Sequence, residues 1–132
     1  TAPFVSPLSY DGMTEGELWS ILHALEGATA PAVLPAATTL LPNYPNPFNP
    51  ETWIPFRLAQ ESSVRVTIYA GDGMVVRILD LGRLPRGLYE NRARAAYWDG
   101  RNEAGEHVAS GVYFYRLQAG GYTATGRMHL LK

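Results

Sequence analysis

A run of five prolines between Leu41 and Phe56, in the sequence LPNYPNPFNPETWIPF, restricts the fold of this chain more than any other feature. Proline fixes φ, lacks a backbone donor and pushes the residue before it towards an extended conformation. Such a run therefore excludes a helix and a central strand. Apolar side chains then alternate over residues 52–58, which predicts that a stiff extended segment leads into the first strand of a β-domain.

Three asparagines lie between these prolines, at Asn43, Asn46 and Asn49. We expect their side chains to hydrogen-bond backbone groups that the proline-rich geometry leaves unpaired. The alternative is a polyproline II ligand for another protein, but that would need regular spacing and an exposed aromatic or basic anchor. We therefore interpret residues 42–50, called the proline-rich segment below, as a structural entry to the domain.

Short strands separated by turns are predicted for the rest of the chain. Residues 63–69 alternate apolar and polar side chains, and glycine-containing turns bound the other candidates. The expected strands are 52–58, 63–69, 74–79, 88–98, 106–109, 112–119 and 122–131. About seven short strands at regular spacing predict an all-β fold, an antiparallel immunoglobulin-like β-sandwich, with Trp98 in its core.

The N-terminal part differs in composition from the rest. Within residues 1–27, the stretch 14–26 has apolar residues at helical spacing, which are Leu18, Ile21, Leu22 and Leu25. It predicts a short α-helix whose apolar stripe docks on the sandwich or on something upstream. Residues 28–39 are rich in Ala, Pro and Thr and predict an extended linker. The expected domains are thus a helical extension (1–27), a linker (28–39) and a sandwich (40–132).

Charge and composition exclude several classes of protein. Without cysteine there is no disulfide or thiolate metal site, and no apolar run approaches the ~20 residues of a membrane-spanning helix, so we expect no membrane insertion. All eleven basic residues lie in 57–132, and five fall close together: Arg83, Arg86, Arg92, Arg94 and Arg101. These five could form a nucleic-acid patch, but the basic excess is small. We expect intramolecular partners and no nucleic acid.

No residue pattern points to catalysis or to a cofactor. The three histidines are widely spaced, and Ser110 lacks the flanking glycines of a nucleophile elbow. The loop 99–106 carries Asp99, Asn102 and Glu103, whose oxygens could bind Ca²⁺. Turn chemistry also explains each of these residues, so we expect a non-enzymatic domain without a cofactor, with calcium as the alternative.

Four sequence motifs together resemble one domain family. They are Asn46-Pro47-Phe48-Asn49-Pro50, Trp98-Asp99-Gly100, Ala109-Ser110-Gly111-Val112-Tyr113 and a last strand that ends in basic residues. Over residues 40–132 the chain resembles the immunoglobulin-like C-terminal domains related to type IX secretion (Por) sorting domains and to the Ig-like domain of the flagellar hook-capping protein.

The resemblance implies a non-catalytic C-terminal module of an exported multidomain protein, secreted or held at the cell surface after passage through the periplasm. In sorting members the last strand is part of the signal, which here implies roles for Arg127, Met128, Leu130 and Lys132. The implied partners are proteins, either the secretion machinery or upstream domains of the same precursor. The alternative is a spacer that packs against an upstream catalytic or adhesive domain.

Overall fold

A computed structural model describes residues 34–132 and contains nine β-strands in this range. In chain order the strands are β1 (Thr39–Leu40), β2 (Thr52–Ile54), β3 (Phe56–Leu58), β4 (Ser62–Ala70), β5 (Val75–Leu84), β6 (Gly87–Tyr89), β7 (Ala96–Trp98), β8 (Gly111–Ala119) and β9 (Tyr122–Leu130). The predicted helix at 14–26 and residues 28–33 of the predicted linker lie outside the described residues. No helix in the described part of the chain could span a membrane.

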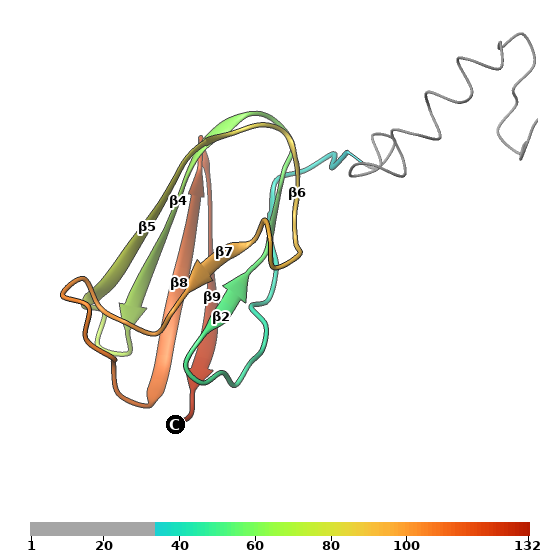
Figure 1. Cartoon of the computed structure of the whole chain (residues 1–132). Coiled ribbons are helices and arrows are strands. Elements are labelled where there is room, and N and C mark those ends of the chain that lie inside the picture. Colours follow the sequence, from blue (N-terminus) through green and yellow to red (C-terminus); the bar gives the residue numbers. More distant parts are fainter. Residues whose placement is uncertain (1–33) are drawn as a thin grey trace, which may run out of the picture. The chain divides into compact units, whose positions relative to one another are not determined.

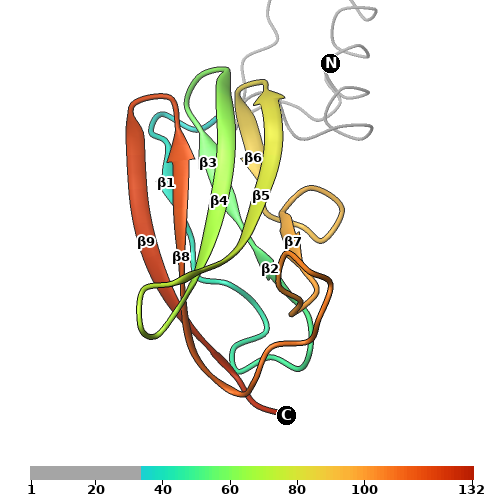
Figure 2. The same ribbon diagram turned by 90° about the vertical axis from the view of Figure 1, so that its left-hand side faces the viewer.

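The strands form two facing layers (Figures 1 and 2). One layer is a four-stranded sheet in the order β5-β4-β8-β9. The other consists of a three-stranded sheet, β1-β3-β6, and a two-stranded sheet, β2-β7. All strand pairs are antiparallel, which confirms the predicted immunoglobulin-like β-sandwich. The compact unit runs from Pro35 to Lys132, so Thr39, assigned above to the linker, already pairs with Arg57.

Alternation along β4 shows why these residues form a sandwich. Val64, Val66 and Ile68 point into the core and are fully buried, whereas Arg65 on the opposite face is exposed. Side chains of both layers interdigitate around Trp98, which is completely buried as predicted. The Nε1 of Trp98 donates to the carbonyl of Arg101 (2.9 Å), so burial leaves no unpaired indole donor.

Two predicted strands are each divided in two. Residues 52–58 form β2 and β3, because Pro55 lacks the N–H that a continuous ladder needs. The two halves pair with different strands, β2 with β7 and β3 with β1 and β6. Residues 88–98 form the end of β6 and β7, since the backbone N atoms of Arg94 and Ala95 both donate to Asn91 and form a turn between them.

The predicted strand at 106–109 is wrong. These residues fold back onto their own loop, where Val108 N donates to Gly100 O and Asn102 N donates to Glu106 O. Only one isolated bridge, between Arg101 and His107, remains of the expected pairing. Conversely, β5 extends beyond the predicted residue 79, because a bulge at Gly82 (φ +74°) keeps it paired with β4.

Candidate functional site

The proline-rich segment is held to the sandwich by hydrogen bonds of its asparagines. Asn43 is buried, and its Nδ2 donates to Pro45 O (3.3 Å) and Thr52 Oγ1 (3.0 Å). Its backbone N donates to the hydroxyl of Tyr115 (3.1 Å). The predicted role of the asparagines is thus confirmed for Asn43. Asn49 is exposed and makes no side-chain hydrogen bond with any residue in 34–132.

The same segment binds the backbone at the end of β9. Asn46 Oδ1 accepts from His129 N (3.0 Å), Phe48 N donates to His129 O (2.9 Å), and Phe48 O accepts from Leu131 N (3.1 Å). In addition, Ser110, just before β8, accepts at its Oγ from Lys132 N (3.0 Å). We call Asn46, Phe48 and Ser110 the clasp, because together they hold residues 129–132.

The clasp pairs the backbone at the end of the last strand. β9 lies at the edge of its sheet, but its final backbone N–H and C=O groups are not free. His129 and Leu131 are paired with the proline-rich segment through a parallel bridge between Phe48 and Leu130. Any backbone N–H and C=O groups of β9 that are free to pair with another protein therefore lie before residue 129.

Aromatic packing and a close glycine contact join the other motifs to the clasp. The ring of Phe48 packs against Trp98 (centroids 5.6 Å apart), and Trp98 packs against Tyr113 (5.5 Å). Gly100 has φ +77°, and a Cβ there would lie 2.5 Å from the carbonyl oxygen of Pro50. Only glycine suits both the backbone conformation and this approach. The four motifs therefore meet at one end of the sandwich.

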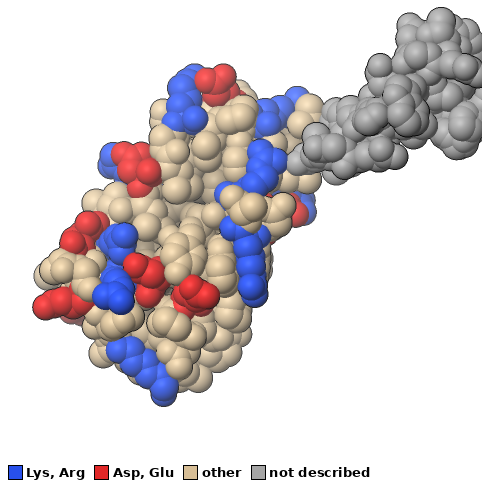
Figure 3. All heavy atoms as spheres, viewed as in Figure 1, with Lys and Arg blue, Asp and Glu red and all other residues tan. Residues whose placement is uncertain are grey.

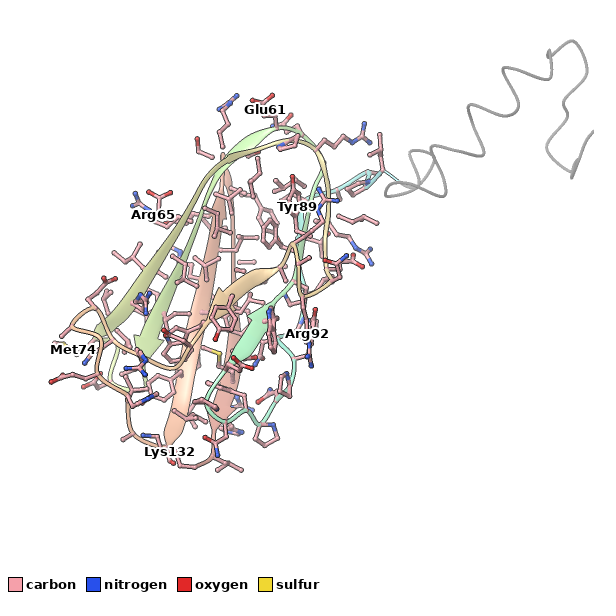
Figure 4. All side chains as sticks on the ribbon, in the orientation of Figure 1. Glu61, Arg65, Met74, Tyr89, Arg92 and Lys132 are labelled. Atoms are coloured by element: carbon pink, nitrogen blue, oxygen red, sulfur yellow. The ribbon has the colours of Figure 1, made fainter. Side chains whose placement is uncertain are left out.

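The four residues of the predicted sorting strand divide into two pairs. Met128 and Leu130 are fully buried in the core, while Arg127 and Lys132 are exposed. Lys132 lies at the opposite end of the sandwich from Glu61 (Figure 4). Met128 and Leu130 therefore anchor the strand, and only the basic side chains are accessible to a partner.

The three candidate calcium ligands already accept hydrogen bonds from the protein. Asp99 Oδ1 accepts from Arg101 N (3.0 Å) and Arg77 Nη1 (3.2 Å). Asn102 Oδ1 accepts from two backbone N atoms of its own loop, and Glu103 Oε2 accepts from Ile78 N (2.7 Å). Among residues 34–132, no three His, Cys, Asp or Glu side chains are grouped so that they could hold a metal ion.

The five clustered arginines all have intramolecular partners, as predicted. The partners are Glu61 for Arg83, Pro35 O for Arg86, the Trp53 ring for Arg92, the Tyr89 ring for Arg94 and Asp99 for Arg101. Acidic and basic side chains also lie interspersed over much of the face seen in Figure 3.

Sequence reasoning missed an aromatic row on the outer face of β2 and β7. Trp53 lies between Tyr44 (centroids 6.3 Å apart) and Tyr97 (5.5 Å). The hydroxyl of Tyr97 donates to Glu51 Oε1 (2.7 Å), and this bond, with a smaller contribution from desolvation, raises the pKa of Tyr97 to about 12. The alternation of Thr52, Trp53 and Ile54 could have indicated that Trp53 faces outwards.

A second missed feature is the contact between Tyr115 and Gly126, which are directly opposite each other on β8 and β9. A Cβ on Gly126 would overlap the Tyr115 ring. The hydroxyl of Tyr115 also donates to Leu41 O (3.3 Å), so this side chain ties the approach to the proline-rich segment to the sheet. A glycine inside a predicted strand is the signal that could have revealed it.

Comparisons with known proteins agree with this architecture. The FlgD Ig-like domain family matches residues 51–123. Dimeric latent PorU from Porphyromonas gingivalis is similar in structure, with a TM-score of 0.52 and 19% identity over 72% of this chain. The matched region is 9% of the PorU chain. No curated protein sequence matches the chain.

Two further solved structures show weaker similarity. PorZ, an essential bacterial surface component of the type IX secretion system of P. gingivalis, has a TM-score of 0.49 and 17% identity over 80% of this chain and 13% of its own. FlgD from P. aeruginosa has a TM-score of 0.43 and 28% identity over 56% of each chain. Since the family match covers more than half of the sequence, this chain belongs to the FlgD Ig-like domain family.

Proposed function

We propose that this domain is a non-catalytic module that sorts an exported protein for secretion or attaches it to the cell surface. The observation that carries the proposal is the clasp. Asn46, Phe48 and Ser110 hold the backbone of residues 129–132, so that the end of the last strand has one defined conformation. The resemblance of the clasped motifs to type IX sorting domains supports the same function.

A fixed strand end suits recognition by a protein partner. Burial of Met128 and Leu130 fixes the direction of the neighbouring side chains, so Arg127 and Lys132 are presented from a rigid element. Holding these residues in place before binding reduces the conformational entropy that association must overcome. The partner is then a protein of the export route, met in the periplasm or at the outer membrane.

The absence of catalysis is part of the proposal. Among residues 34–132, the carboxylates best placed to act as acids or bases, Asp99 and Glu103, accept bonds from arginine or backbone donors. A general acid or base must instead be free to exchange a proton with a substrate. These side chains stabilise the loop 99–106 and its contact with β5.

A reporter fusion in a bacterium with a type IX system tests the sorting function. Residues 1–132 are fused to the C-terminus of a periplasmic reporter, and the surface and periplasmic fractions are measured. Deleting 127–132 would remove two core side chains, Met128 and Leu130, so charge reversal is the sharper change. The test variant is Arg127→Glu with Lys132→Glu, and the control is Arg65→Glu with Arg83→Glu.

We expect the parent and control fusions to reach the surface and the test variant to accumulate in the periplasm. If a folded parent fusion stays in the periplasm, sorting is wrong and the domain is a spacer for an upstream partner. If the test variant reaches the surface as efficiently as the parent, sorting stands but Arg127 and Lys132 do not carry it.

A further inference from the structure

We propose that the outer edge of β9 between Thr123 and Arg127 is a strand-addition site for an extended segment of a protein partner. The segment would direct an apolar side chain towards the sandwich and carboxylates towards the outer face. The site would be the contact surface of the module. Only the identity of the partner, a protein of the export route, rests on the proposed function.

The direction of the backbone groups of β9 identifies the site. The N and O atoms of His129 point away from β8, since they bond the proline-rich segment. Backbone groups of an antiparallel strand alternate with a period of two, so those of Thr123, Thr125 and Arg127 point the same way. No hydrogen bond joins these outward groups to any residue in 34–132.

Protecting contacts are found on the opposite edge of the sheet and at the end of β9, which distinguishes this stretch. On β5, at the opposite edge of the sheet, Glu103 accepts from Ile78 N (2.7 Å) and donates its own N to Val76 O (3.1 Å). The clasp covers β9 from residue 129 onwards. An unprotected edge favours pairing with another chain, and proteins usually block it with charges, bulges or covering loops. Figure 2 shows β9 at the margin of its sheet.

A hollow beside the open edge indicates what the inward side chain must be. It has a volume of about 320 Å³ and is lined by Leu40, Leu41, Pro42 and Tyr115, with Gly126 on the β9 side. Gly126 has no side chain and is covered by the ring of Tyr115, so the inward residue of an added strand would enter this hollow beside that ring. An aliphatic side chain suits such a lining, since its burial removes apolar surface from water.

Charge on the outer face indicates the outward side chains. Arg127 lies on the open stretch, and Arg116 is directly opposite Thr125 on β8. Neither guanidinium makes a hydrogen bond or an ion pair with another described residue. A strand with carboxylates on this face would have Arg127 on the neighbouring strand, where opposite charges stabilise pairing. Arg116 lies one strand further away and adds positive charge to the same face.

A synthetic strand tests the site on the full chain. The probe is the blocked peptide Ac-TEVELET-NH2, whose glutamates would face outwards while its valine and leucine face the hollow. Its control is the same peptide N-methylated on the three glutamates, which removes the donors that would face β9. Binding is followed by NMR shifts and amide exchange of Thr123, Thr125 and Arg127.

We expect saturable shifts at these three amides and about ten-fold slower exchange with the probe, and no change with the N-methylated peptide. Thr125→Pro should abolish binding, because it removes an outward N–H that β8 does not use. Thr125→Val, which keeps this donor, should bind like the parent. Should Thr125→Pro fail to fold, Arg116→Glu with Arg127→Glu should weaken binding of the acidic probe instead.

Three results would overturn the site: no saturable change at the three amides, equal effects of both peptides, or amides already protected in the free chain. The last result would mean that another part of the chain or a second copy occupies the edge. The binding assay needs no secretion host, so its failure is separate from failure of the reporter fusion. Binding without sorting would leave the site intact and refute only the proposed function.

Discussion

Asn46 accepts a hydrogen bond from the backbone N of His129 across 83 positions of sequence. Phe48 extends this contact in both directions, because its N donates to His129 O and its O accepts from Leu131 N. The first extended segment of the domain is therefore bonded to the last strand. The contacts that hold the proline-rich segment to the sandwich are therefore also the ones that position its final residues.

Replacing Trp98 with alanine should lower the free energy of unfolding by about 3–5 kcal/mol. The indole is completely buried between Phe48 and Tyr113, and its removal leaves a cavity and takes one of two donors from the Arg101 carbonyl, which keeps its bond from Arg77. Urea denaturation measures the loss. Tyr97→Ala, on the exposed side of the same strand, is the control and should cost less than half as much. Equal losses would show that Trp98 is not the centre of the core.

A pair of glycine variants isolates the contact between the Trp-Asp-Gly turn and the proline-rich segment. Gly100 and Gly105 both have positive φ, +77° and +84°, but a Cβ meets Pro50 O only at Gly100. Gly105→Ala should cost about 1 kcal/mol of stability from backbone strain. Gly100→Ala should cost about 1–3 kcal/mol more, since Pro50 must also move. Equal destabilisation of the two variants would contradict the close approach.

Titration of Tyr97 should be displaced to alkaline pH. The bond to Glu51 raises the pKa of its phenol to about 12, against about 10 in an unfolded chain. The folded state therefore holds the proton more tightly, so this contribution to stability is complete below pH 10 and is lost as pH rises through 12. NMR of the Tyr97 ring carbons measures the midpoint. Glu51→Gln should lower it, Glu61→Gln should not, and a parent midpoint near 10 would refute the effect.

Calcium should not stabilise the domain. The oxygens of Asp99, Asn102 and Glu103 accept protein hydrogen bonds, so binding an ion would require these bonds to break. Melting curves in chelator and in excess calcium should therefore coincide. A calcium-dependent rise of several degrees that Asp99→Asn abolishes would instead establish the loop 99–106 as an ion site.

Local patterns made much of this fold predictable. The alternation in β4, β8 and β9 is a period-two signal that depends only on neighbouring residues, and the structure has a strand at each of these three places. The position of Trp98, at the end of a weakly patterned strand and before a turn, predicts its place in the core, and the structure buries it there. The burial of Met128 and Leu130 on one face, with His129 on the other, follows from the same alternation.

Long-range pairing could not be read from the sequence. Pro55 indicates a break, but which strands pair with β2 and β3 depends on residues far along the chain. Likewise, nothing local shows that Asn46 would bond His129, or that Glu103 would bond Ile78 rather than an ion. A short polar side chain has many possible partners, and only the assembled fold selects one.

Amide hydrogen exchange at His129 tests most directly whether the proline-rich segment holds the last strand. Asn46→Ala removes the acceptor, so the His129 amide should exchange faster while the Met128 amide, which faces β8, stays protected. Asn49→Ala is the matched control, because Asn49 belongs to the same segment but makes no such bond. Faster exchange at His129 in Asn46→Ala alone is the expected result. Unchanged exchange, or equal acceleration in both variants, would contradict the clasp.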